Sequence, residues 1–186
     1  LNFCTTDLSA FYFDIRKDTL YCDPINSEKR KSCVTILNVL LKSLLRWFAP
    51  ILSFTTEEIH QLISKNTKSI HLEKFLTFPD KFKNEQLTER WSQLIKIRDV
   101  CNISIEEKRA NKEIGSSLEA ELKIKLNEKY KDIISKIDLS ELCIVSKTQI
   151  NFDEGSDILV ETKKALGDKC PVCWKISVEP CERHPQ

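Results

Sequence analysis

Apolar residues recur at three- and four-residue steps between Ser27 and Phe48, and this spacing predicts a long helix. Its polar side is narrow, because beyond the charged start only Lys42, Ser43 and Arg46 interrupt the apolar positions. We therefore expect this helix to be buried among neighbours in the core of a helical bundle. Six residues are expected on its main apolar face: Val34, Leu37, Leu41, Leu44, Leu45 and Phe48.

Pro50 should end this helix, because proline has no N–H to donate and disfavours helical geometry in the residue before it. A second helix is expected from Thr55. Thr55 and Glu58 have the spacing of a capping box, and Phe54 with Ile59 that of a hydrophobic staple.

Three further elements are expected in the first part of the chain. The spacing of Leu8, Phe11 and Ile15 predicts a short amphipathic helix before the central one. Residues 64–84 lack a helical repeat and should form an extended strap across the bundle. A helix should resume near Glu85, carry a highly charged end over 106–113, and stop at Gly115.

The hydrophobic period then changes from 3.6 to 2. Residues 118–126 alternate between apolar and charged side chains, which predicts a strand with one buried face. We expect a short helix over 130–137, a second strand at 142–145, a loop at 151–157 and a third strand at 158–161. Together these form a small α/β unit.

The expected fold is therefore mainly α and has three parts. A helical bundle covers residues 1–114 and includes the strap at 64–84. A small α/β junction domain covers 115–165. The tail over 166–186 carries Cys170, Cys173, Cys181 and His184 at close spacing and is expected to form a zinc knuckle.

The composition narrows the choice of partners and compartment. The net charge is only +1, so the chain has no global basic field for nonspecific nucleic-acid binding, and we expect no DNA partner. No leader peptide is recognisable, and Lys42 and Arg46 interrupt the longest apolar run. We expect a cytoplasmic protein without a membrane partner.

Catalytic motifs are missing. The chain contains no phosphate-binding glycine motif and no nucleophile elbow, and it has only three glycines. His60 is expected on a helix surface, and His71 should be hydrogen-bonded within the strap. We expect this polypeptide to catalyse nothing by itself.

Cysteine and histidine residues near the end provide the main chemical signal. Cys170 and Cys173 form one pair, and Cys181 and His184 form another, each separated by two residues. This is the spacing with which two turns present four ligands to a tetrahedral zinc ion. A redox pair is the rival interpretation, but such pairs usually open a helix within a βαβ unit. The five other cysteines are scattered and are expected to pack as small apolar residues.

Four segments resemble the C-terminal part of bacterial isoleucyl-tRNA synthetases. They are FYFDIRKDTLYCD at 11–23, LLRWFAPILSFTTEEI at 44–59 with HLEKF at 71–75, IGSSLEAEL at 114–122, and KCPVCWK at 169–175. The second segment is shared with valyl and leucyl relatives, whereas the other three point to the isoleucine enzyme.

The resemblance implies an anticodon-binding bundle, a small junction domain and a zinc knuckle that contacts the anticodon arm. The parent would be an isoleucine-tRNA ligase that joins isoleucine to its tRNA using ATP and Mg²⁺. Its catalytic and editing domains would lie upstream, so this fragment would bind isoleucine tRNA and adjoin the upstream catalytic domain of the same polypeptide.

Five residues are candidates for RNA contact, because an aromatic ring can stack on an unpaired base and a cationic side chain can meet phosphate. Arg46 and Arg98 could equally pair with acidic residues on neighbouring helices, and Trp174 could simply cover the metal. Trp47 and Trp91 are expected in the core. The candidates are Trp174, Lys175, Arg183, Arg46 and Arg98.

Two alternatives remain open at the level of sequence. The resemblance implies a second pair that is usually another C-x-x-C after a His-Pro, so the partners of Cys170 and Cys173 are either Cys181 and His184 or residues further along the polypeptide. The chain could also be a free-standing helical protein-interaction module with a structural zinc knuckle.

Overall fold

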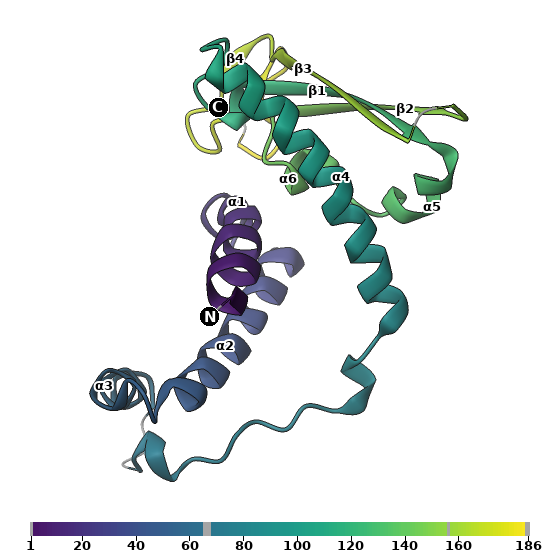
Figure 1. Ribbon diagram of the computed structural model, residues 1–186. Helices are drawn as coiled ribbons and strands as arrows, with labels where there is room; N and C mark the ends of the chain where they lie inside the picture. Colours follow the sequence, from purple (N-terminus) through teal and green to yellow (C-terminus); the bar gives the residue numbers. More distant parts are fainter. Residues whose placement is uncertain (1, 65–67, 156, 185–186) are drawn as a thin grey trace. The chain divides into compact units, whose positions relative to one another are not determined.

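The computed structural model describes residues 2–64, 68–155 and 157–184, and its elements are mainly helical with a small sheet region near the C-terminus (Figure 1). The longer helices are the π-helix Phe3–Phe13, α1 (Asp14–Cys22), α2 (Glu28–Phe48), α3 (Ser53–Ile63) and α4 (Glu85–Ala110). The short helices are α5 (Lys131–Ile134), α6 (Leu139–Leu142) and the 3₁₀ turns Ile70–Leu72, Asp80–Phe82, Ser117–Glu119 and Glu128–Tyr130. The strands are β1 (Ala120–Asn127), β2 (Lys147–Asp153), β3 (Ile158–Lys164), β4 (Asp168–Lys169) and β5 (Ile176–Ser177).

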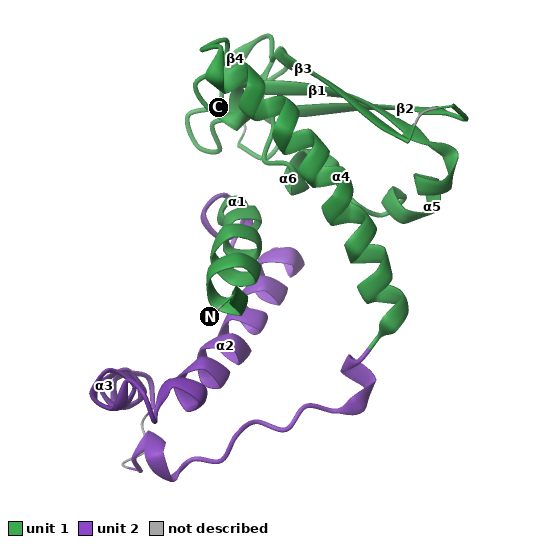
Figure 2. Ribbon diagram, viewed as in Figure 1, with its two compact units in different colours: residues 1–18, 84–186 green, residues 19–83 purple. Residues whose placement is uncertain are grey.

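The chain divides into two compact units (Figure 2). Unit 1 consists of residues 1–18 and 84–186, and unit 2 consists of residues 19–83. This grouping differs from the expected division at residue 114, because α4 packs against β3 and shares one core with the sheet. The expected domain boundaries remain a prediction about the organisation of the longer protein.

Unit 1 is built around strand β1. The three-stranded sheet has the order β2-β1-β3, with β2 parallel and β3 antiparallel to β1. The predicted alternation is confirmed, since every second residue of β1 is fully buried: Ala120, Leu122, Ile124 and Leu126. α4 contributes its own buried side chains to the same core: Leu94, Ile97, Cys101 and Ile105.

The first helices also belong to this core. The predicted helix around Leu8–Ile15 is confirmed, although it is longer than expected and its first part is a π-helix. Ile15 is buried against the residues of the core, and the ring of Phe11 meets Trp91 edge-on, with 6.0 Å between ring centroids.

The connection between β1 and β2 differs from the prediction. The expected strand at 142–145 is wrong, because residues 139–142 form α6, and the second strand lies later, at Lys147–Asp153. The expected loop at 151–157 is therefore partly strand. Leu142, Cys143 and Val145 are buried in the core, but they reach it from the end of α6 and the turn after it. A short apolar run in the sequence does not distinguish this arrangement from a buried strand.

Unit 2 contains α2, α3 and the strap. Ser27 caps α2, because its Oγ accepts a hydrogen bond from the N–H of Arg30. Leu45 and Ala49 at the end of α2 are buried with Ile70 of the strap, and Ile59 of α3 packs against them. This small cluster holds the three segments together.

The expectation that α2 is buried on most sides is wrong. Val34 and Leu41 of the expected apolar face are exposed, and Leu44 and Phe48 are half-buried. Within unit 2, α3 and residues 70–74 of the strap contact α2, and several of its apolar side chains, among them Ile36 and Val39, are exposed. Trp47, expected in the core, is 45% exposed.

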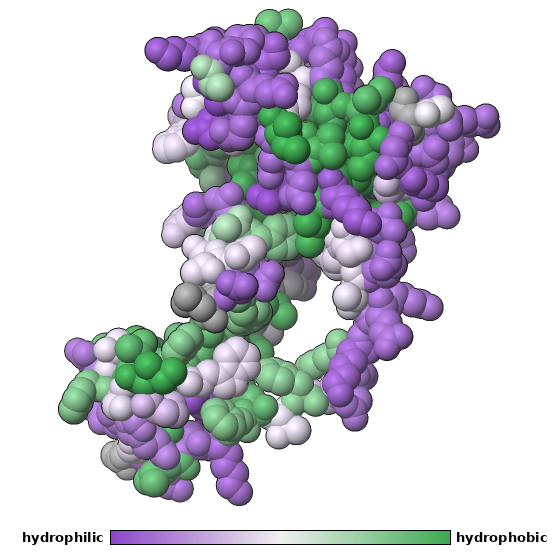
Figure 3. All heavy atoms as spheres, viewed as in Figure 1, coloured by the Kyte–Doolittle hydropathy of each residue, from purple (hydrophilic) through white to green (hydrophobic). Residues whose placement is uncertain are grey.

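The start of α3 also differs from the prediction. The helix begins at Ser53 rather than after Thr55, and Phe54 is 92% exposed, so the expected capping box and staple do not form. Instead, the Oγ1 of Thr56 donates to the carbonyl of Leu52 at 2.9 Å. Hydrophobic surface is visible over α3 in Figure 3.

The polar residues of α3 hold the strap. The Glu57 carboxylate accepts hydrogen bonds from the Ser69 hydroxyl and the Ile70 N–H, both at 2.8 Å, and these bonds lower the pKa of Glu57. His60, expected at the surface, is buried, with its Nε2 3.2 Å from the carbonyl oxygen of Lys68. Part of the strap, residues 65–67, lies outside the described residues.

Replacing Leu122 by alanine should destabilise unit 1 by about 2 to 5 kcal/mol, the usual cost of truncating a fully buried leucine. Leu122 is 0% exposed at the centre of the sheet. Leu159→Ala is the matched control, because Leu159 lies on the opposite face of the same sheet and is 56% exposed. Urea unfolding followed by circular dichroism measures both. Equal destabilisation by the two substitutions would show that the two faces do not differ in burial as described.

Candidate metal centre and nucleic-acid interface

The candidate ligands lie on a small hairpin formed by β4 and β5 and on the turn that follows it. β4 and β5 pair in antiparallel register, Asp168 with Ser177 and Lys169 with Ile176. Gly167 permits this close pairing: its φ is +119°, and a Cβ atom there would lie 2.1 Å from the backbone of Ser177. No side chain larger than hydrogen fits at this position.

Two tight turns present the ligands. In the first, Cys170 N donates to the carbonyl of Lys175 at 2.9 Å, and Trp174 N donates to the carbonyl of Cys170 at 3.0 Å. Trp174 closes this turn with a φ of +64°, a left-handed conformation that is uncommon for a bulky residue. In the second turn, His184 N donates to the carbonyl of Cys181 at 3.0 Å.

The four candidate ligand atoms converge. The sulfur and imidazole nitrogen atoms of Cys170, Cys173, Cys181 and His184 all lie within 4.8 Å of one another. Cys173 Sγ is 3.8 Å from Cys181 Sγ, and His184 Nδ1 is 3.7 Å from Cys170 Sγ and 3.3 Å from Cys181 Sγ. A tetrahedral zinc site with ordinary bond lengths has edges of about 3.8 Å between sulfurs and about 3.5 Å between sulfur and nitrogen. The cluster could therefore hold a metal ion.

The thiols of this cluster differ in acidity. Hydrogen bonds lower the pKa of Cys170 to about 6. The largest contribution comes from the backbone N–H of Cys173, and the N–H of Val172 and the side chain of His184 add to it. Burial raises the pKa of Cys173 to about 11. Burial also opposes ionisation of Cys181, but the N–H groups of Arg183 and His184 outweigh it and lower its pKa. Hydrogen bonds to thiolate sulfur thus prepare one cysteine of each pair for metal binding.

Side chains elsewhere in unit 1 hold the hairpin in place. The Ser146 hydroxyl donates to the carbonyl of Leu118, just before β1, and accepts a 2.6 Å hydrogen bond from the N–H of Ile176. Arg183 donates to the Asp18 carboxylate at 2.6 Å. No motif in the sequence points to Ser146 or Asp18, because both act through contacts between distant segments.

Two of the predicted RNA-contact residues lie beside the cluster and differ in exposure. Trp174 is 58% exposed, and the Nζ of Lys169 lies 5.1 Å from the centroid of its ring. Lys175 is half-buried and faces Asp138: burial opposes the charge on Asp138, but hydrogen bonds from Ser140 and then the charge of Lys175 lower its pKa. Lys169 was not among the predicted contacts, although it directly precedes the first ligand.

The three predicted arginines all have partners within the chain. Arg46, in unit 2, pairs with Glu73 at 2.9 Å and also donates to the carbonyls of Lys74 and Lys42. Arg98 donates to the carbonyl of Leu142 and lies over the ring of Phe11 at 5.3 Å. The alternative of pairing with acidic residues on neighbouring helices is met only in part, because Glu73 is acidic but lies after the 3₁₀ turn of the strap, and the partners of Arg98 are a carbonyl and an aromatic ring. The RNA contacts of these arginines remain predictions.

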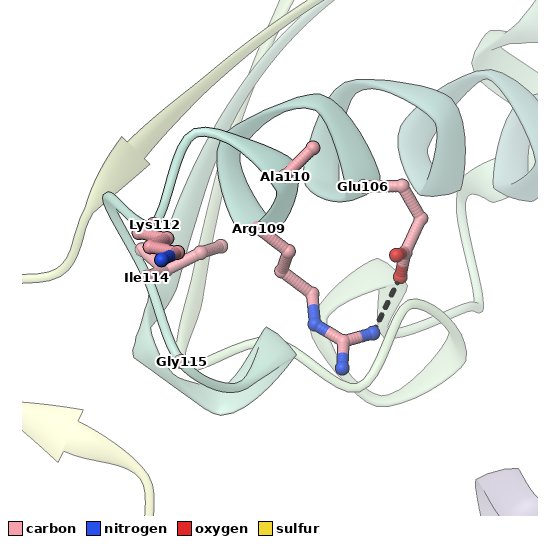
Figure 4. A pocket seen from close by; sticks show the side chains of 6 residues that line it. All are labelled: Glu106, Arg109, Ala110, Lys112, Ile114 and Gly115. Atoms are coloured by element: carbon pink, nitrogen blue, oxygen red, sulfur yellow. Dashed lines mark hydrogen bonds and ion pairs between the residues drawn. The ribbon is translucent and has the colours of Figure 1, made fainter.

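A shallow pocket lies at the end of α4 (Figure 4). It is lined by Glu106, Arg109, Ala110, Lys112, Ile114 and Gly115. Figure 4 shows the guanidinium of Arg109 turned toward Glu106, and the two groups form an ion pair at 2.7 Å. This pairing engages Glu106 and Arg109 and leaves Lys112 as the other charged group of the lining, which contains no cysteine or histidine.

Comparison with known protein families finds one matching family model. Residues 1–126 match the family model described as the anticodon-binding domain of tRNA ligase. The chain belongs to this family. The cysteine cluster lies outside the matched residues, so the anticodon-binding domain model neither includes nor explains the candidate metal centre.

Relatives that align with nearly the whole chain are isoleucine–tRNA ligases. One from Pelagibacter ubique is 59% identical over 99% of the chain, one from Methylacidiphilum infernorum is 42% identical over 95%, and one from Bartonella henselae is 38% identical over 94%. The chain spans about a fifth of the length of these curated relatives.

Within the described residues, no helix is both long and apolar enough to cross a membrane.

Gly167→Ala should weaken metal binding by the cluster, because the added methyl group collides with the β5 backbone and displaces the hairpin. Cobalt(II) titration, read from its thiolate absorption bands, measures the effect. Gly155→Ala is the control: within the described part of the chain, its Cβ would meet Asp153 Oδ1 at 3.6 Å, an ordinary van der Waals distance. Unchanged cobalt affinity in Gly167→Ala would mean that the hairpin does not shape the cluster.

Proposed function

We propose that this chain is the tRNA-binding C-terminal region of an isoleucine–tRNA ligase. The match of residues 1–126 to the anticodon-binding domain family carries this proposal. Relatives that align with nearly the whole chain are named isoleucine–tRNA ligase, which favours isoleucine tRNA as the partner. The parent enzyme would join isoleucine to tRNA using ATP and Mg²⁺ in a catalytic domain upstream, in the cytoplasm.

The metal in the proposed site is zinc, held by Cys170, Cys173, Cys181 and His184. Three thiols and one imidazole suit zinc, and the distances between the ligand atoms agree with a tetrahedral site. The role of zinc is structural. When bound, it fixes the two turns that carry Trp174 and Arg183.

RNA contact in this proposal comes chiefly from the surface beside the zinc site. Trp174 is the exposed ring that an unpaired base could stack on, and Lys169 and Lys175 supply positive charge next to it. Arg183 lies on the second turn, where the ion pair with Asp18 positions it.

The zinc proposal predicts that Cys181→Ser and His184→Ala each reduce the zinc content of the purified chain well below one ion per molecule. Mass spectrometry of the metal measures this after dialysis. Cys33→Ser is the control, since Cys33 is buried in α2, apart from the cluster in the sequence, and should leave zinc stoichiometric. Full zinc content in both ligand variants would mean that Cys181 and His184 are not ligands. Little zinc in the wild-type chain, restored in a longer form of the chain, would place the second pair further along the polypeptide.

The RNA proposal predicts that the chain binds isoleucine tRNA without charging it. Trp174→Ala should weaken binding by about 1 to 3 kcal/mol, the usual contribution of one stacked base, measured by fluorescence anisotropy. Trp174→Phe keeps a ring at this position and should recover part of the affinity. A chain that binds no tRNA, while a second protein copurifies with it stoichiometrically, would favour the alternative of a protein-interaction module.

A further inference from the structure

The open face of the three-stranded sheet carries an unusual arrangement of charge. The strand register places eleven residues on the face opposite the core: Glu121, Lys123, Lys125 and Asn127 from β1, Lys147, Gln149, Asn151 and Asp153 from β2, and Leu159, Glu161 and Lys163 from β3. Four of these are lysines, two are glutamates, and one is Asp153 at the far end of β2, whose carboxylate accepts a hydrogen bond from the N–H of Gly155. The four lysines lie on the part of the face from the start of β1 to Lys125, so this part is basic, although the whole chain has a net charge of only +1.

The two glutamates of this face interact with side chains of the outer strands β2 and β3. Glu121 lies 3.7 Å from the Nζ of Lys147 and also accepts a hydrogen bond from Gln149 at 2.7 Å. Glu161 pairs along its own strand with Lys163 at 3.1 Å, not with Lys123, its neighbour across the sheet.

The lysines of the central strand form no ion pair among the described residues. Among the described residues, the side chains of Lys123 and Lys125 make no hydrogen bond or ion pair. Lysines on edge strands are common because they discourage strands of other molecules from pairing, but β1 is the central strand and has no free edge to protect. Lysine also has a low preference for strands, so local structure does not account for the pair.

The position of this face links it to the proposed RNA site. Ser146 holds the metal hairpin through Ile176 and directly precedes Lys147, the first residue of β2. The hairpin therefore lies at the end of the sheet where β1 and β2 begin. A nucleic-acid strand that reaches the hairpin has the sheet as its neighbouring surface.

We propose that this basic face, centred on Lys123 and Lys125, contacts the phosphate backbone of the bound tRNA. The proposal rests on the tRNA-binding function proposed above. Lysine ammonium groups are point charges that suit phosphate, and the face lacks the arginines that read base edges in pairs of hydrogen bonds. The contact adds affinity for RNA in general and no preference among tRNA sequences.

The salt dependence of binding tests this proposal with the whole chain and isoleucine tRNA. Removing one phosphate contact makes the slope of log K against log salt shallower by about 0.7 to 0.9. The double variant Lys123→Gln/Lys125→Gln should therefore have a slope shallower by about 1.4 to 1.8, and its preference for isoleucine tRNA over an unrelated tRNA should not change.

Two comparisons make the outcome specific. Lys96→Gln/Lys136→Gln removes the same charge from exposed positions on α4 and after α5, and it should keep the wild-type slope. Trp174→Ala should lower affinity without changing the slope. An unchanged slope in the Lys123/Lys125 variant, or an equal change in the control, overturns the sheet contact alone. Absence of tRNA binding by the wild-type chain overturns the proposed function as well.

Discussion

The burial of one face of β1 is the constraint on which unit 1 depends. Four alternate residues of this strand are fully buried and meet the apolar face of α4, and the strand pairs with β2 on one side and β3 on the other. Because side chains alternate across a strand, burying this face commits the intervening charged residues to the opposite one. The core and the basic face of the sheet are thus two results of the same pattern.

The cysteine cluster depends on this framework. Its hairpin is short, and Ser146 and the Arg183–Asp18 ion pair connect it to the sheet and to α1. Gly167 allows the two strands to approach, and the turn closed by Trp174 brings Cys170 and Cys173 together. A metal ion bound here would stabilise a geometry that hydrogen bonds already favour, so the candidate RNA-contact side chains beside it would be held in fixed positions.

Unit 2 is organised less completely by its own contacts. Leu45, Ala49 and Ile70 form a small core, and Glu57 and His60 fasten the strap to α3 through hydrogen bonds. Many large apolar residues of α2, α3 and the strap remain exposed, among them Phe54, Leu62, Leu72 and Phe75. A narrow polar side in a helix shows how much apolar surface exists, but it does not identify what covers that surface.

The features that could be predicted from the amino-acid sequence are those that depend on local spacing. They are the long helices, the alternating strand at 118–126 and the two Cys/His pairs, because helix period, strand period and knuckle spacing are all encoded within a few neighbouring residues. The other features follow from tertiary packing. β2 begins after residue 146 instead of at 142–145, His60 is buried, Trp47 is exposed, and Arg46 and Arg98 have internal partners, because each outcome depends on contacts between segments far apart in the chain.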